Sequence, residues 1–207
     1  MKTLFLSILT LFTLSFTTGC SPIVPKYRVN IDAITAPNLE VTPSSFRIEV
    51  LGENTDRNSL LFQEQSTYLV KLLLSKGYIQ PYSSSGVKEI IYFDYGIEKV
   101  LEEVRTDTEP EVTVGFSIGR HYHPFWSDWG YYRTYRKKYS YYNRYITLLA
   151  KDQMGKELWR VDASSIGESK NLKRIVPILL EASIPYIGKN TKEPIKIVIK
   201  EKSDKKE

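Results

Sequence analysis

The sequence predicts an α+β fold, with a mostly antiparallel sheet and two helices packed on one face. Short stretches of alternating apolar and polar residues recur along the chain, and this period of two is typical of half-buried strands. Only two longer stretches, at 58–76 and 171–187, have the spacing of an amphipathic helix. About eight strands thus accompany two helices, and several strands follow one another directly, which favours antiparallel pairing. The 207 residues, 42% of them hydrophobic, suit one domain of ordinary size.

The first half of the chain is expected to contain several strands and the first helix. Alternation is strict at 27–33 and 46–50, so each of these is expected to bury one face. The helix at 58–76 is followed by Gly77, which stands where a left-handed cap is expected. The later stretch 90–97 (IIYFDYGI) is rich in apolar and aromatic residues, which favours a central strand.

The second half is expected to begin with a strand at 112–118, where valine, phenylalanine and isoleucine alternate with small or polar residues. Period-two alternation returns at 146–150 and again at 159–163. A short polar turn with Gly155 separates these two strands, which predicts a β-hairpin.

The second helix, at 171–187, has plausible start and stop residues. Asn171 is expected to cap its N-terminus. Pro177 is expected to kink or restart it, and Pro185 to end it. A last strand at 195–199 alternates isoleucine with polar or smaller residues.

The N-terminus predicts secretion and a lipid anchor. An apolar stretch at 4–16 is too short to span a bilayer, which needs about 20 residues, and it leads to Cys20, the only cysteine. The segment resembles a bacterial lipoprotein signal, which implies removal of 1–19 and lipid modification of Cys20. Two or more acyl chains anchor a protein stably to a membrane. Ser21, in place of aspartate, favours the outer membrane over the inner. The alternatives are a cleaved secretory signal with an unmodified cysteine and a short membrane anchor.

These features predict the organisation of the chain. It consists of a lipoprotein signal peptide at 1–19, a lipidated N-terminus and spacer at 20–26, one α+β domain at 27–200 with an insertion at 120–145, and a charged tail at 201–207.

Three stretches carry a family resemblance. They are IIYFDYGI at 90–97, RYITLLAKDQMGKELWRVDASSIGES at 144–169 and NLKRIVPILLEASIPYIGKNT at 171–191. Their order, which is a strand, a glycine turn, a tryptophan-bearing strand and a proline-bearing helix, resembles domain-of-unknown-function family 4136, a group of bacterial envelope lipoproteins. The resemblance implies an envelope lipoprotein and assigns neither an activity nor catalytic residues.

The insertion at 120–145 differs in composition from the rest of the chain. It holds eight of the fifteen tyrosines, two of the three tryptophans and six basic residues, against one acid, Asp128. Tyrosine, tryptophan and arginine are enriched at binding interfaces. We therefore expect a binding surface formed by Trp126, Trp129, Tyr131, Tyr132, Arg133, Tyr135 and Arg136.

Several interpretations of the insertion stay open. An envelope protein, a glycan or anionic lipid at the membrane interface each suits aromatic and basic side chains. The structural alternative is a long β-hairpin at 131–145 whose aromatic pairs only stabilise it. The preceding 98–111 carries six acids. It is expected to be a solvated loop or hairpin end, with pairing to the basic residues as the alternative.

The sequence gives little support for catalysis. We expect that the protein is not an enzyme and that it binds neither a cofactor nor a metal. His121 and His123 are the only histidines and are weak metal candidates, because only Asp128 is nearby as a third ligand. Neither histidine is accompanied by the Gly-x-Ser-x-Gly motif of many serine hydrolases. An enzyme that acts on envelope glycans through paired carboxylates remains the alternative from another class.

The predicted function is that of a lipid-anchored, periplasm-facing protein with a structural or binding role. The net charge of +5 favours anionic envelope partners. Nucleic acid is not expected as a partner, because the protein is expected to lie outside the cytoplasm. A secreted periplasmic binding protein without a lipid is the second alternative.

Overall fold

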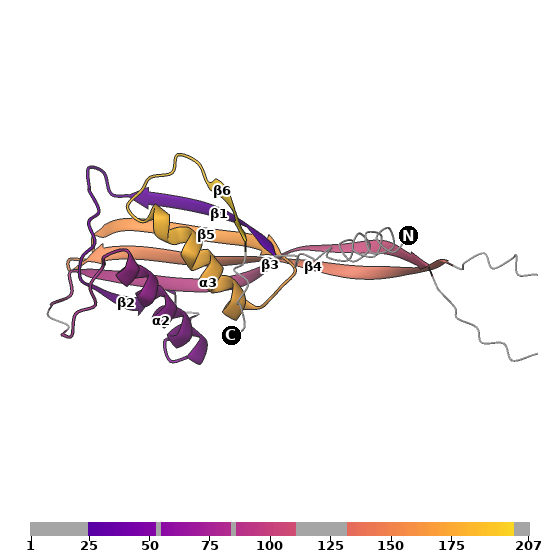
Figure 1. Cartoon of the computed structure of the whole chain (residues 1–207), viewed down its shortest axis with the longest axis horizontal. Helices are drawn as coiled ribbons and strands as arrows, with labels where there is room; N and C mark the ends of the chain where they lie inside the picture. Colours follow the sequence, from indigo (N-terminus) through magenta and orange to yellow (C-terminus); the bar gives the residue numbers. More distant parts are fainter. Residues whose placement is uncertain (1–24, 53–54, 84–85, 111–131, 201–207) are drawn as a thin grey trace, which may run out of the picture. The chain divides into compact units, whose positions relative to one another are not determined.

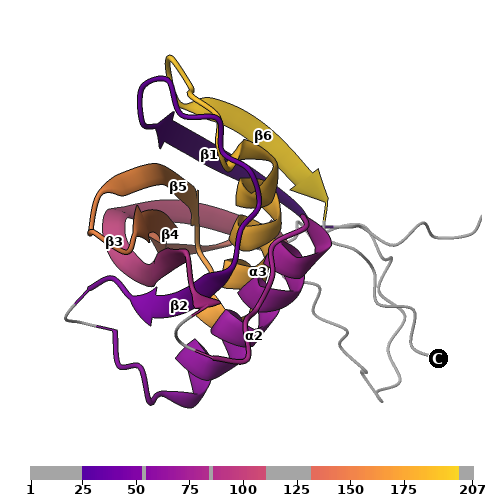
Figure 2. The ribbon, with the colours of Figure 1, turned by 90° about the vertical axis from the view of Figure 1, so that its left-hand side faces the viewer.

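A computed structural model describes residues 25–52, 55–83, 86–110 and 132–200, and it confirms the predicted α+β fold. Among these residues, six strands form one sheet in the order β2-β3-β4-β5-β1-β6, and helices α2 and α3 lie on the same face of it (Figures 1 and 2). The elements are β1 Lys26–Thr35, β2 Phe46–Val50, α2 Leu60–Ser75, β3 Glu89–Pro110, β4 Tyr132–Asp152, β5 Glu157–Gly167, α3 Leu172–Ser183, the 3₁₀ helix η3 Ile184–Tyr186 and β6 Ile195–Lys200.

The sheet is mixed, with one parallel pair. The pairs β3–β4, β4–β5 and β5–β1 are antiparallel, and β4–β5 is the predicted hairpin. β2 pairs with β3 in parallel, because α2 connects the two strands as a crossover. The short piece at 78–79 contributes only a bridge between Ile79 and Ser45. The strand predicted at 112–118 lies outside the described residues.

The ends of α2 follow from local chemistry. The hydroxyl of Ser59 accepts a hydrogen bond from the Phe62 N–H at 3.1 Å and so caps the N-terminus. Gly77 has φ +99°, which confirms the predicted left-handed cap. The next amide, of Tyr78, donates to the Leu73 carbonyl at 3.1 Å, as in a Schellman motif.

The core lies between the helices and one face of the sheet. Alternate residues of β3, β4 and β5 point to this face, and the apolar stripes of both helices cover them. Burial at these positions supplies most of the stabilising apolar contact. The fully buried side chains of this layer include Leu69, Leu73, Ile91, Phe93, Ile146, Leu148, Val161, Ile175 and Leu179.

Pro177 does not restart α3, since the helix runs unbroken from Leu172 to Ser183. Proline has no N–H, so the carbonyl of Lys173 loses its partner one turn earlier. The side chain of Gln65 on α2 replaces that partner, with Nε2 donating to the Lys173 oxygen at 3.4 Å. Asn171 caps the helix as predicted, because its side chain accepts from the Arg174 N–H.

We expect Gln65 and Pro177 to be energetically coupled. Gln65→Leu leaves the part-buried Lys173 carbonyl without this partner, whereas in a Pro177→Ala background the alanine N–H restores the helical bond. Gln65→Leu should therefore cost about 1 kcal/mol more with proline than with alanine at position 177. Urea unfolding of the four proteins measures this coupling, and equal costs in both backgrounds would contradict it.

The strands β3 and β4 extend beyond the other strands as a two-stranded arm. β2 pairs with only the first five residues of β3, and β5 pairs with β4 only from Tyr142 onward. Residues 99–110 and 132–142, here called the arm, pair with each other along its length (Figure 1). Twelve residues of extended strand span roughly 40 Å.

The arm corrects two sequence predictions. Residues 98–110 of the acidic stretch do not form a loop, because they belong to β3 and pair with the basic part of β4 as far as Pro110. Residues 131–145 do not form a hairpin on themselves, since β4 is a single strand from Tyr132. Both strands carry charged side chains, as expected for a ribbon with solvent on both faces. Such strands lack the alternation of apolar and polar residues that identifies a half-buried strand.

Candidate functional site

The structure places part of the predicted binding surface on the arm. Tyr135 and Arg136 lie in β4 and therefore point to opposite faces of the ribbon. Tyr132 and Arg133 are the first two residues of β4. The other predicted site residues, namely Cys20, His121, His123, Trp126, Trp129 and Tyr131, lie outside the described residues.

The two faces of the arm carry different side chains. Residues directly opposite each other in an antiparallel pair share a face. A bulge at Val100 shifts the register, so that Leu101 pairs with Tyr141 and Glu103 with Tyr139. The face away from the helices, here called the tyrosine face, contains Leu101, Glu103, Arg105, Tyr135, Lys137, Tyr139 and Tyr141.

Cation–π and ionic contacts organise the tyrosine face. The guanidinium of Arg105 and the ammonium of Lys137 lie 5.3 and 5.4 Å from the centre of the Tyr139 ring. Arg105 also contacts Glu103 at 2.8 Å and donates to the Tyr141 hydroxyl at 3.2 Å. These contacts restrain the Tyr139 and Tyr141 rings. They do not bury the rings, and every member of the cluster remains solvent-accessible.

The opposite face of the arm carries acid–base pairs. Glu102 forms salt bridges with Lys138 across the ribbon and with Lys99 on its own strand. The hydrogen bonds from Lys138 and then from Lys99 lower the pKa of the Glu102 carboxyl. The alternative that the acidic stretch pairs with the basic segment is thereby confirmed for this pair. Such exposed pairs fix register more than they add stability.

The arm also exposes apolar side chains that no described part of the chain covers. Val100, Leu101 and Val104 are 49%, 55% and 59% exposed, and Ile166 at the end of β5 is 60% exposed. Beyond β2 and β5 the arm strands have no further neighbours among the described residues, so their outer edges offer free backbone donors and acceptors. A two-stranded ribbon with these features is marginal alone in water and suits a partner.

Tyr145 and Gly96 form the root of the arm on the tyrosine side. The two residues pair directly, and a Cβ at Gly96 would lie 2.4 Å from the Tyr145 hydroxyl and 2.5 Å from Cζ. The ring therefore lies across the glycine, which leaves no room for a side chain. Burial raises the pKa of the Tyr145 hydroxyl, and the nearby carboxylate of Asp94 adds to the effect.

Arg144 forms the root on the helix side and is only 3% exposed. Its Nε donates to the Ser165 carbonyl at 2.9 Å, and its two terminal nitrogens donate to the Ser165 hydroxyl and the Ser169 carbonyl at 3.1 Å each. The guanidinium lies against Gly167, where a Cβ would come within 2.9 Å of it. Arg144 therefore joins β4 to the end of β5 and to the segment that leads into α3.

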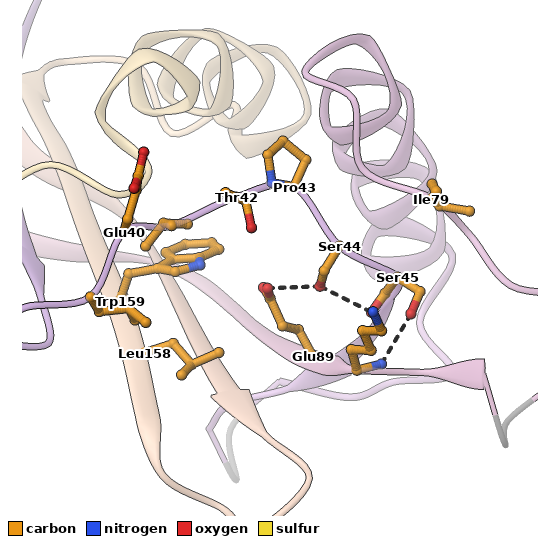
Figure 3. Close-up of a pocket in the computed structure, with 12 residues that line it drawn as sticks. Glu40, Thr42, Pro43, Ser44, Ser45, Ile79, Glu89, Leu158 and Trp159 are labelled. Carbon is orange, nitrogen blue, oxygen red and sulfur yellow. Dashed lines mark hydrogen bonds between the residues drawn. The ribbon is translucent and has the colours of Figure 1, made fainter.

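A second candidate site is a pocket of about 510 Å³ at the opposite end of β3 from the arm. The connection between β1 and β2 forms one wall, and the starts of β3 and β5 form the floor. Figure 3 shows Glu89 and the indole of Trp159 directed towards the same space. The remaining lining residues are Leu39, Glu40, Val41, Thr42, Pro43, Ser44, Ser45, Ile79, Lys88 and Leu158.

Polar groups inside this pocket are buried and incompletely paired. Glu89 is 7% exposed, and its Oε1 accepts from the Ser44 hydroxyl at 2.7 Å. Its Oε2 and the Trp159 Nε1 have no partner in hydrogen-bond geometry within the described residues, and neither does the hydroxyl of Tyr78, which does not line the pocket. Burial raises the pKa of the Glu89 carboxyl, while the Ser44 hydroxyl and the indole N–H, which is close but poorly aligned, act in the opposite direction.

We expect Glu89 to make stability fall as pH rises. Because the pKa in the folded state lies above the ordinary value of 4.5, the folded protein binds this proton more tightly. This contribution is fully present below about pH 4.5 and is lost as pH rises through the folded pKa. A folded-state pKa that is one unit above the ordinary value contributes about 1.4 kcal/mol to the free energy of unfolding. Glu89→Gln should flatten the profile, which urea unfolding between about pH 4.5 and 7.5 measures. Identical profiles would refute the assignment.

Sequence reasoning missed this pocket. Glu89 stands just before the apolar stretch 90–97, and its position in the sequence does not indicate that it is buried. Trp159 was expected on a buried face, and it is 2% exposed. Ser44, Glu89 and Trp159 come from three separate elements, so only the sheet register brings them together.

The described part of the chain offers neither a cluster of metal-binding side chains nor a helix that could span a membrane. No three histidine, cysteine, aspartate or glutamate side chains of this part gather in a way that could hold a metal ion. None of its helices is both long and apolar enough to cross a bilayer. The weak metal prediction for His121 and His123 falls outside these ranges and stays a prediction.

No family model matches the sequence, and no curated protein matches it significantly. The resemblance carried by 90–97, 144–169 and 171–191 therefore stays a prediction.

Proposed function

We propose that this protein is a lipid-anchored component of the bacterial cell envelope that binds another envelope protein through its arm. The anchor rests on the N-terminal segment, with its apolar stretch and lone Cys20. The binding role rests on the arm. The proposal assigns no catalytic step to the protein.

The observation that carries the binding role is the combination of open strand edges and exposed apolar and aromatic side chains on one ribbon. Leu101 and Val104 are more than half exposed, and two cations lie over the Tyr139 ring. A partner strand added to a free edge gains backbone hydrogen bonds, and its side chains gain contact with the tyrosine face. Aromatic and arginine side chains supply most of the energy at such interfaces.

A protein partner fits the arm better than a glycan or a lipid surface does. The arm part of β4 is basic and that of β3 is mainly acidic. Glu102 pairs with Lys138 across the ribbon and Glu103 pairs with Arg105 on its own strand, so much of the charge is neutralised. An anionic membrane favours a face with an excess of positive charge. Free backbone edges favour another polypeptide, since only a backbone offers matching donors and acceptors at strand spacing.

The anchor predicts that Cys20→Ser releases the protein from the membrane. A protein that loses all its acyl chains loses the hydrophobic contribution that holds it to the bilayer. We expect the protein to move from the membrane fraction to the soluble periplasmic fraction and to lose label from radioactive palmitate. Ser21→Ala, next to the modified position, serves as the control and should retain both. Unchanged labelling of the Cys20→Ser protein would overturn the anchor.

The binding role is tested by photocrosslinking in intact cells. A photoreactive residue at Leu101 on the tyrosine face is expected to give an adduct of discrete mass with one protein. The matched probe at Lys71, exposed on α2, should give none. Adducts with lipid or glycan alone, or equal adducts from both probes, would show that the arm does not bind a specific protein.

A further inference from the structure

We propose that the partner of the tyrosine face is a second copy of this chain. The inference rests on the proposed function, because it names the partner of the same surface. Three features carry it. The face is open to solvent, its charges complement those of a second copy in one arrangement, and that arrangement also brings its tyrosines next to cations and to one another.

The tyrosine face is accessible to another molecule. It lies on one side of the sheet, and both α2 and α3 lie on the other side (Figures 1 and 2). Leu101 is 55% exposed, and the side chains of Arg105 and Glu103 are 52% and 43% exposed. No helix of the described part of the chain therefore lies between this face and a second copy. Two sheets that pack face to face lie about 10 Å apart, so their side chains interdigitate.

The strand register divides the tyrosine face into rows that cross the ribbon. From the root outward, the first three rows are Leu101 with Tyr141, Glu103 with Tyr139, and Arg105 with Lys137, and Tyr135 belongs to the fourth. The second row thus carries a carboxylate, and the third row carries two cations. An acidic row next to a basic row can complement itself when a second copy is turned over onto it.

A two-fold axis that crosses the ribbon between the second and third rows brings opposite charges together. The two arms then run in opposite directions, and each row lies over the row of the other copy at the same distance from the axis. Glu103 of each copy faces Arg105 of the other. The same operation places Lys137 over the Tyr139 ring of the other copy and Tyr141 over its Tyr135.

Other symmetric arrangements bring like charges together. An axis through the second row would place the two Glu103 carboxylates over each other, and an axis through the third row would do the same with the Arg105 guanidiniums. If both arms pointed the same way, Arg105 would lie over Lys137 of the other copy. Contacts between like charges suppress such arrangements at an interface. Charge therefore selects the antiparallel arrangement with the axis between the two rows.

The groups that would meet across the axis are not used up within one copy. Arg105 contacts Glu103 and the Tyr141 hydroxyl through a single terminal nitrogen, Nη2. A guanidinium has five N–H donors, so the others can reach the carboxylate of a second copy. Tyrosine and arginine are also the side chains that contribute most at interfaces. Because the contact is symmetric, each interaction occurs twice and association stops at the pair.

The charge arrangement gives a reciprocal test in intact cells. Two differently tagged versions of the full chain are expressed together, each with the photoreactive residue at Leu101. The yield of the crosslinked product that carries both tags is then measured. We expect such a product, with twice the mass of the chain. Glu103→Arg in both copies should lower its yield tenfold or more, and so should Arg105→Glu in both, because like charges then face each other.

The decisive comparison combines the two variants. A copy with Glu103→Arg and a copy with Arg105→Glu again face each other with opposite charges, so the product with both tags should return to nearly its original yield. The contact between positions 103 and 105 within each copy remains lost, so a purely structural role predicts no recovery. Lys71→Glu, exposed on α2, makes the same change of charge away from the arm and should leave the yield unchanged.

The outcomes separate this inference from the proposed function. An adduct of the Leu101 probe with a different protein, and none with a second copy, would overturn the inference and leave the proposed function in place. No protein adduct at all would overturn both. Absence of recovery in the mixed pair would contradict the symmetric arrangement. If a charge-reversal variant accumulates poorly, Arg105→Gln is a milder change and should lower the yield severalfold, and an unchanged yield would then overturn the inference.

Discussion

Arg144→Met is expected to lower the free energy of unfolding by about 3 kcal/mol. The arginine is almost fully buried and donates three hydrogen bonds, two of them to the carbonyls of Ser165 and Ser169. Methionine keeps the length of the stem but removes every donor, so two carbonyls and a hydroxyl lose a charged partner in a buried setting. Urea unfolding followed by circular dichroism measures the change.

Arg160→Met is the matched control on the neighbouring strand. Arg160 is exposed and forms a salt bridge with Asp162 at 2.7 Å, so its loss should cost well under about 1 kcal/mol. Arg144→Lys should be nearly as harmful as Arg144→Met, because an ammonium cannot reproduce the planar fork of three bonds. Equal costs for Arg144→Met and Arg160→Met would show that Arg144 does not hold the root of the arm.

Replacement of Tyr135, Tyr139 and Tyr141 by serine is expected to reduce partner binding tenfold or more and to leave the core intact. The three tyrosines share the tyrosine face, and none of them contributes to the buried layer under the helices. Loss of several aromatic contacts at one interface typically costs more than 1.4 kcal/mol in binding, which is tenfold. The thermal midpoint should change by only a few degrees, since the arm lies outside the core.

The opposite face of the arm provides the control for this variant. Arg136→Ser with Lys138→Ser removes two cations from the same strand but leaves the tyrosine face unchanged. We expect this double variant to keep most of the partner binding. A loss as large as that of the tyrosine variant would indicate that the charge of the arm, and not its aromatic face, recognises the partner.

The sequence alone predicts the strands and helices that have one buried face and one exposed face. β1, β2 and β5 alternate because one face meets the helices, and Gly77 and Asn171 identify helix ends through local chemistry. The confirmed helices, hairpin and fold class all depend on such local signals. Pro177 shows the limit of local reasoning, because a distant glutamine supplies the bond that proline removes.

The arm and the pocket depend on contacts between distant parts of the chain. Residues 98–106 lack a buried face, so their charges resembled a loop, and only pairing with β4 reveals a strand. Tyr135 and Arg136 were singled out by composition, but the register that places them on opposite faces could not be inferred. Glu89 was missed because its burial arises from Ser44 and Trp159, which are 45 and 70 residues away.

The central claim is that the tyrosine face of the arm binds another envelope protein. The most direct test is the yield of crosslinked product from the Leu101 probe in intact cells, compared between the original protein and the variant with serine at 135, 139 and 141. We expect one discrete protein adduct from the original and at least a tenfold lower yield from the variant, at equal amounts of folded protein. Equal yields from both, or no protein adduct from the original, would contradict the claim.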